Sequence, residues 1–410
     1  MYNTVFYFII VIVIFEYLLE RWLDYLNSKN RTAQLPDELK GVYDEEKYKK
    51  SIDYDKVNSK FATVISTLNF FLIILMLSLG GFALVDQMAG EFTSNPIIKA
   101  LVFFAILGLA SDILHIPFSI YDTFVIEEKF GFNKTTVKTF VFDKIKGWLL
   151  SLIIGGGLGY LILWFYYKTT DMFWIYAWIM TTAFLIFFVM FYSNLIVPLF
   201  NKQELLEDGE LKEAIKQFAD KVGFKLDNVY RIDGSKRSTK ANAYFTGLGA
   251  KKRIVLYDTL IKELTTNEIV AVLAHEIGHY KRKHTLQGIV LSILQAGLTF
   301  YLISIFLKYP ALSQALGVSQ PNFHIGIIAF GVLYTPFSMI IGMAMNILSR
   351  KNEFQADNFA NQNFEAEHLI NALKKLSVNN LSNLTPHPVY VFFHYSHPTL
   401  LQRIKALRKI

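Results

Sequence analysis

The sequence predicts a multi-pass α-helical membrane protein that carries an α+β domain on its cytoplasmic side. Three observations predict this fold class. Hydrophobic residues make up 53% of the 410-residue chain, whereas charged residues make up only 18%. The apolar residues gather into stretches of about 20 residues or more, the length that a helix needs to cross a bilayer. Between these stretches, strongly basic loops alternate with loops that hold almost no positive charge.

We expect seven transmembrane helices, because the sequence contains seven such stretches. The buried helices of a large soluble enzyme rarely run this long without a charge, which disfavours a soluble fold. The predicted spans are 4–23, 61–85, 97–125, 148–167, 172–200, 286–306 and 325–348.

The positive charges orient these helices. The segments 24–60, 126–147 and 201–284 and the tail from 349 hold eight, five, sixteen and eight Lys and Arg residues, whereas 86–99, 168–171 and 308–322 hold one each. Basic loops stay on the cytoplasmic side, so we expect the N-terminus outside and the C-terminus in the cytoplasm. Six or eight spans would break the alternation. The net charge of +7 is then mainly a signal of topology in a lipid bilayer, and nucleic acid is not expected as a partner.

The first apolar stretch is expected to be retained, because it lacks a basic leading segment and an Ala-x-Ala cleavage site. The membrane would be the endoplasmic reticulum in a eukaryote and the inner membrane in a bacterium. The third span contains Asp112, His115 and Asp122, which cannot comfortably face lipid. They should face a water-filled interior or other helices, and the sequence leaves open whether they touch substrate or pair with each other.

The polar segments predict their own elements. The charged segment 35–60 is typical of an interfacial helix or an ordered loop, and 204–222 of an amphipathic helix. Two strand-like runs, 241–246 and 253–257, are separated by a Gly-rich turn and predict a hairpin. The residues 268–274 favour a helix that Thr265 or Thr266 can cap.

This last helix continues into His275-Glu276-Ile277-Gly278-His279. Because the two histidines are four positions apart, both imidazoles leave the same face of a helix. That spacing allows two neutral imidazoles to hold one Zn²⁺, with Glu276 beside the open coordination position. The alternative is a surface helix that happens to carry two histidines. The chain has no cysteine, so the zinc ligands must be nitrogen and oxygen donors.

A zinc hydrolase needs a third protein ligand and one open position. Glu353 and Asp357 are the candidates, because they are four apart on a predicted helix and point the same way. Glu353 can bind zinc while Asp357 accepts the other ring N–H of a ligand histidine. Alternatively, both acids simply favour the positive end of a solvated helix. The spacing alone leaves both interpretations open.

Five motifs together resemble one family. They occupy 123–133, 238–245, 275–279, 349–357 and 397–404. In this order they resemble the type I CaaX prenyl proteases, integral-membrane zinc endopeptidases that include the yeast a-factor converting enzyme. The resemblance runs from about the third span to the C-terminus. The shorter bacterial protease HtpX shares the zinc motifs but has fewer spans.

The resemblance implies that the seven helices enclose a large intramembrane chamber and that a zincin-like metalloprotease domain closes its cytoplasmic end. On this basis we expect four segments along the chain. Membrane helices one to five occupy 1–200, and helices six and seven occupy 285–348. The metalloprotease domain consists of 201–284, with the hairpin and the zinc helix, and of 349–410, with the third ligand. The resemblance also implies one Zn²⁺ per chain, held by His275, His279 and Glu353.

The resemblance further implies roles for residues near the scissile bond. Asn242, with Ala243 and Tyr244, matches an edge strand that engages the substrate backbone, although an Asn at a hairpin is more often part of a turn. His397 can donate a hydrogen bond to the oxyanion, and Arg403 can bind a substrate carbonyl or carboxylate. Their alternatives are a structural residue at a helix start and a snorkelling arginine. The sequence gives no role beyond structure to His284, His324, His387 and His394.

We therefore expect a zinc metalloendopeptidase in which Glu276 is the general base that takes the proton of water and returns it to the leaving amine. Its substrates would be peptides or proteins cut near a C-terminus that is prenylated or membrane-associated. Within proteolysis, the alternative is quality control of misfolded membrane proteins, as in HtpX. A non-proteolytic alternative is a transporter or receptor whose histidines sense zinc. Such a protein would not need Glu276.

Overall fold

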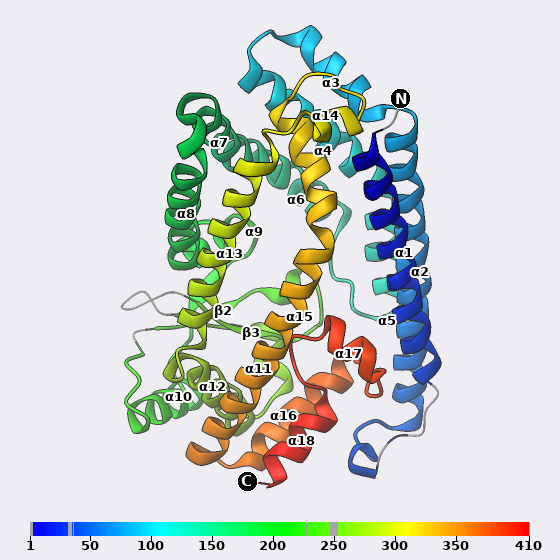
Figure 1. The fold of residues 1–410 in the computed structure, drawn as a ribbon. Helices are drawn as coiled ribbons and strands as arrows, with labels where there is room; N and C mark the ends of the chain where they lie inside the picture. Colours follow the sequence, from blue (N-terminus) through cyan, green and yellow to red (C-terminus); the bar gives the residue numbers. More distant parts are fainter. Residues whose placement is uncertain (1–2, 32–34, 36, 227, 247–252, 410) are drawn as a thin grey trace.

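The computed structural model describes residues 3–31, 35, 37–226, 228–246 and 253–409. Long, roughly upright helices form most of the molecule (Figure 1). The N-terminus lies at one end of these helices. The C-terminus lies at the other end, beside a small sheet and a group of shorter helices (Figure 1).

Within the described residues, five helical stretches are long and apolar enough to cross a membrane. They are Glu45–Ser78 (α2), Pro96–Phe130, Val137–Phe200, His284–Phe306 (α13) and Phe323–Asn363 (α15). The second comprises α4 (Pro96–Tyr121), a wide π-type turn at Asp122–Glu127 and α5 (Glu128–Phe130). The third comprises α6 (Val137–Leu150), a similar turn at Ser151–Gly155, α7 (Gly156–Thr169), α8 (Phe173–Leu195) and α9 (Val197–Phe200).

The five stretches support a multi-pass helical protein, while the count of seven stays a prediction. Two of the predicted spans lie in the single stretch Val137–Phe200, where α7 packs against α8. The first predicted span lies in α1 (Thr4–Asn30), which is not one of the five. Its apolar part contains Glu16, Glu20 and Arg21.

Helix α2 differs at both ends from the predicted membrane span 61–85. The segment 45–60 is the start of the membrane helix itself, which Asp44 caps by accepting a hydrogen bond from the Lys47 N–H. At the other end the helix stops at Ser78 instead of 85, because Gly80 adopts a left-handed conformation with φ of 69°. The chain then forms the separate helix α3 (Gly81–Phe92), which packs on α4.

The sheet has four strands in the order β1-β2-β4-β3. They are β1 (Gln203–Leu205), β2 (Val229–Ile232), β3 (Ala243–Thr246) and β4 (Arg253–Tyr257). Strands β2 and β4 are parallel and the other pairs antiparallel, with Ala243 opposite Leu256. The predicted hairpin of β3 and β4 is confirmed, its turn at 247–252 lying outside the described residues. Because β1 pairs with β2, the helix predicted from 204 begins only at Glu210.

The remaining helices surround this sheet or cap the far end of the membrane helices (Figure 1). They are α10 (Glu210–Lys221), α11 (Asp258–Glu263), α12 (Thr266–Lys281), α14 (Pro310–Ala315), α16 (Ala366–Asn379), α17 (Pro388–His394) and α18 (Leu400–Lys409). Short 3-10 turns occur at Asp37–Leu39, Thr170–Met172 and Gly234–Lys236. Thr265 begins α12 with a capping box: its side chain accepts the Glu268 N–H, and the Glu268 carboxylate accepts the Thr265 N–H.

Two hydrophobic cores lie at opposite ends of the molecule. One gathers residues of the sheet, α10, α12, α16 and α18, and the other gathers residues of α1, α3, α4, α7, α14 and the start of α15. Between them, none of the described residues 331–352 of α15 or 52–76 of α2 is buried. Helix α15 contributes residues to both cores and so connects the two ends.

Helix α12 crosses α15 at very close range. A Cβ added to Gly278 would lie 3.1 Å from both the Cα and the carbonyl oxygen of Ala356, and 3.2 Å from the Cβ of Phe359. Because two of these contacts are with backbone atoms, a larger residue would have to push the helices apart.

We predict that Gly278→Ala destabilises the protein by about 1–3 kcal/mol, the usual result of overpacking. The measurement is the midpoint of thermal unfolding of the purified protein in detergent. Gly342→Ala in α15 is the matched control, because its Cβ would meet nothing within 4 Å. It should raise the midpoint slightly through helix propensity. Equal midpoints for the two variants would contradict the close crossing.

Candidate active site

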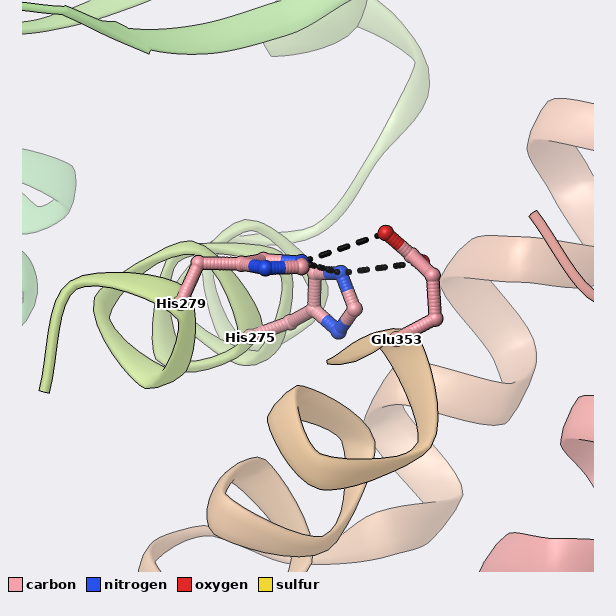
Figure 2. Close-up of side chains that lie close together, drawn as sticks. All are labelled: His275, His279 and Glu353. Carbon is pink, nitrogen blue, oxygen red and sulfur yellow. Dashed lines mark hydrogen bonds and ion pairs between the residues drawn. The ribbon is translucent and has the colours of Figure 1, made fainter. Parts of the chain in front are cut away.

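The two motif histidines project from α12 toward α15, where Glu353 faces them (Figure 2). The Nε2 atoms of His275 and His279 are 3.2 Å apart. Glu353 Oε1 lies 3.2 Å from His279 Nε2, and Glu353 Oε2 lies 3.5 Å from His275 Nε2. His275 and Glu353 are buried, and His279 is partly exposed. Two segments far apart in the chain thus bring three donor atoms to one point.

These distances fit one tetrahedral zinc ion. With Zn–N and Zn–O bonds of about 2.1 Å, two ligand atoms of a tetrahedral site lie about 3.4 Å apart. This is close to the separation of the two imidazole nitrogens and to the distance from each of them to its nearest Glu353 oxygen. Glu353 Oε2 is also buried without a hydrogen-bond partner. Nitrogen atoms facing each other and an unpaired buried oxygen are unfavourable unless a cation lies between them. The cluster therefore suits a divalent ion that accepts N and O donors.

Asp357, one turn after Glu353, holds the far side of His275. Its Oδ1 lies 2.8 Å from His275 Nδ1. Burial and the nearby Arg403 lower the pKa of the His275 imidazole, but hydrogen bonds to Asp357 and Glu353 outweigh them and raise it to about 9. Asp357 is therefore the outer partner that orients this ring and strengthens its basicity, whereas Glu353 lies on the metal-facing side.

The role of Arg403 in binding a substrate carbonyl or carboxylate stays a prediction. In the structure its guanidinium donates to Asp357 through two nitrogens, Nε to Oδ2 at 2.9 Å and Nη2 to Oδ1 at 2.6 Å. The third nitrogen lies 3.7 Å from Glu353 Oε2. Since Asp357 occupies the planar fork, the arginine stabilises the buried carboxylate behind His275.

His397 reaches the cluster from the segment before α18. Its Nδ1 lies 3.0 Å from Glu353 Oε1, while 65% of the side chain is exposed. Helix α15 also holds the chain just ahead of it: Asn346 Nδ2 donates to the Phe393 carbonyl at 2.8 Å, and Arg350 donates to the Val391 carbonyl at 3.2 Å. An exposed imidazole beside the donor cluster is placed to meet a bound molecule.

Glu276 faces a cavity of about 320 Å³ next to the cluster. The cavity is lined by Glu276, His279, His284, Thr285, Gln287, Gly288, Leu291, Met345, Leu348, Ser349 and Asn352. In the described part of the chain, the Glu276 carboxylate has no hydrogen-bond or ion-pair partner. An unpaired carboxylate on such a cavity can exchange a proton with a molecule inside it.

The predicted substrate-binding segment lies at a sheet edge, since β3 is the last strand in the order. The Asn242 carbonyl accepts the Tyr257 N–H at 3.1 Å, and its side chain accepts the Ala243 N–H at 2.8 Å. Tyr244 directs its hydroxyl to Gln203 Nε2, 3.1 Å away. The Tyr244 side chain therefore makes contacts within the domain. An added strand would pair with the backbone at the outer edge of β3.

Two of the three ionisable residues of the third predicted span contact residues of other helices. Asp112 accepts hydrogen bonds from Lys144 Nζ and Trp148 Nε1, both at 2.8 Å, and His115 Nε2 lies 3.0 Å from Asn69 Oδ1. These contacts are structural, but they join Asp112 and His115 to other helices and not to each other.

Sequence reasoning missed one histidine beside the cluster. His284, expected to be structural, lies with its Nδ1 only 3.0 Å from His279 Nδ1. It is five positions after His279, which is not a spacing that shares a helix face. The contact arises because the chain breaks between α12 and α13, where Lys283 has φ of 60°. No sequence pattern signals that break.

Comparison with known proteins decides the family. Residues 24–202 match the family described as CAAX prenyl protease N-terminal, five membrane helices, and residues 205–410 match peptidase family M48. CAAX prenyl protease 1 of Saccharomyces cerevisiae is 36% identical over 96% of this chain and 92% of its own length. The human CAAX prenyl protease 1 homolog is 32% identical over 97% and 94%.

The chain belongs to the CAAX prenyl protease 1 family. The crystal structure of S. mikatae Ste24p agrees, with a TM-score of 0.94 at 34% identity over 99% of this chain and 100% of that one. The resemblance seen in the motifs is thereby confirmed. As a member of this family the protein is a multi-pass integral membrane metalloprotease that acts on peptide or protein substrates.

We predict that Glu353→Ala lowers the metal content of the purified protein well below one ion per chain. The reason is that the variant removes one of three donors and leaves two imidazoles to hold the ion. Metal analysis after gel filtration measures the ratio. Glu365→Ala, which changes an exposed acid just beyond the end of α15, is the control and should keep the wild-type ratio. An unchanged ratio in Glu353→Ala would move the third ligand elsewhere.

Proposed function

We propose that this protein is a zinc metalloendopeptidase that cuts prenylated proteins near a C-terminal CaaX sequence. The observation that carries the proposal is the convergence of His275, His279 and Glu353 at zinc-site distances in a chain of this family. The relatives are named CAAX prenyl proteases, and the chain spans more than nine-tenths of their length. One zinc ion per chain follows from one cluster of this kind in the described residues.

The chain's own residues supply the remaining chemistry. Zinc held by the three ligands supplies Lewis acidity, which polarises a carbonyl and makes water more acidic. Glu276 takes a proton from the attacking water and delivers it to the leaving amine. His397, exposed beside Glu353, donates a hydrogen bond to the oxyanion that develops on the scissile carbonyl, an interaction worth about 3 kcal/mol.

The substrate backbone binds as an added strand on β3. Its free edge at Asn242 and Ala243 offers main-chain donors and acceptors, which fix a peptide without demanding a particular side chain. This mode suits an enzyme whose substrates share a lipid and a terminal position more than a sequence.

Seven helices around an intramembrane chamber complete the proposal. Two packed cores at opposite ends, joined by helices without buried residues at 331–352 and 52–76, support an open interior between them. An isoprenoid chain needs an apolar environment of this kind, because its exposure to water is unfavourable. The basic loops favour an N-terminus outside and an active site on the cytoplasmic side. The termini lie at opposite ends of the long helices, as this orientation requires (Figure 1). The membrane would be the endoplasmic reticulum of a eukaryote or the inner membrane of a bacterium.

We predict that Glu276→Gln retains zinc but loses about 10²–10⁴-fold in peptidase activity, because the amide cannot accept the proton of water. Metal analysis and peptide cleavage are measured on the same preparation. Glu210→Gln, the same change at an exposed position of α10, is the control. Undiminished hydrolysis by the Glu276 variant would assign the general base to another residue.

The substrate class is tested with a farnesylated C-terminal peptide and its unlipidated twin, each with and without a chelator. We expect rapid cleavage of the lipidated peptide alone, abolished by the chelator and restored by zinc. The lipid adds apolar area that the interior can bury. Equal cleavage of both peptides would instead indicate broad quality control of the HtpX type.

A further inference from the structure

The two ligand histidines of α12 have different partners on their outer ring nitrogens. His275 Nδ1 faces Asp357, a charged acceptor that Arg403 holds in place. His279 Nδ1 faces the neutral ring of His284 at 3.0 Å. Outer partners of this kind fix the tautomer and orientation of a ligand imidazole. The position of His284 therefore allows it to influence the tautomer and orientation of His279.

His284 is itself held on both sides. It is buried at 8% exposure, and its Nε2 lies 2.9 Å from Gln355 Oε1 on α15. Its ring meets that of His279 at 74°, with centroids 5.1 Å apart. His284 is also the first residue of α13, directly after Lys283 in its left-handed conformation. The ring therefore has little freedom to turn away.

The direction of each hydrogen bond follows from the metal site. Nε2 of His279 must be unprotonated to bind zinc, so the proton sits on Nδ1. This N–H donates to Nδ1 of His284, which then carries its own proton on Nε2 and donates it to Gln355 Oε1. Each nitrogen and oxygen of this hydrogen-bond series from His279 to Gln355 is thus either a donor or an acceptor. The tautomers of both histidines are assigned from this pattern.

We propose that His284 is a positioning residue that orients His279 for zinc through the Nδ1–Nδ1 hydrogen bond, with Gln355 fixing His284 in turn. The inference rests on the proposed zinc site. It also means that α15 secures all three ligands: Glu353 directly, His275 through Asp357, and His279 through Gln355 and His284. The membrane helix α13 is thereby connected to the metal centre by its first residue.

The test compares zinc affinity among variants of the full-length protein in detergent. His284→Leu removes the acceptor, while His284→Asn keeps an oxygen close to the Nδ1 position. Gln355→Leu removes the acceptor that orients His284. His368→Leu, a partly exposed histidine of α16, is the control. Competition with a chromophoric chelator gives the zinc dissociation constant, and the visible spectrum of the Co²⁺-substituted protein reports the ligand geometry.

We expect His284→Leu to weaken zinc binding about 10–100-fold, the usual effect of losing an outer partner, and to alter the Co²⁺ spectrum. His284→Asn should restore most of the affinity, and Gln355→Leu should lie in between. The thermal unfolding midpoint identifies any variant that fails to fold. If His284→Leu fails to fold, His284→Asn and Gln355→Leu carry the test.

Two results would overturn the inference. Wild-type zinc affinity in a folded His284→Leu variant would show that His279 needs no outer acceptor. Equal loss in the Leu and Asn variants would show that the ring matters for packing and not for its hydrogen bond. A wild-type protein that binds no zinc would refute the proposed function itself, and the inference with it.

Discussion

The close crossing of α12 over α15 is the constraint on which the whole site depends. Because Gly278 has no side chain, the backbone of α15 approaches it at Ala356, one turn after Glu353. This approach brings a carboxylate of one helix opposite the two imidazoles of the other (Figure 2). The other contacts of the site also lead to α15, through Asp357 behind His275 and through Asn346 and Arg350 beneath the segment of His397.

The polar surroundings of the cluster are asymmetric, and this asymmetry suits hydrolysis. On one side, Asp357 and Arg403 form a buried ion pair that fixes His275 rigidly. On the other, His279 and the neutral His284 border the cavity together with the unpaired carboxylate of Glu276. The buried ion pair therefore fixes one ligand histidine, and the cavity keeps an unpaired carboxylate available for proton transfer.

Features encoded locally could be predicted from the sequence. Helix α12 with its Thr265 cap, the β3–β4 hairpin and the pair His275 and His279 depend on short-range patterns, and the structure contains them. The spacing alone leaves the role of Glu353 open between two interpretations, and the family resemblance selects it as the third ligand. Features that depend on partners far away in the chain could not be predicted from the sequence. Residues 203–205 form a strand because β2 pairs with them, Arg403 turns to Asp357 from another helix, and His284 meets His279 only through the break at Lys283. In each case tertiary contacts override local preference.

Helix α15 has a mechanical consequence. It runs for 41 residues, about 60 Å, from the core at the N-terminal end past the donor cluster, and it contains Pro336 about a third of the way along. A proline removes one backbone hydrogen bond, so flexing concentrates there. The two arms of the helix on either side of Pro336 therefore need not share one tilt. A change in bilayer thickness, which acts on the tilt of membrane helices, would be absorbed at this residue before it reached the arm that carries Glu353.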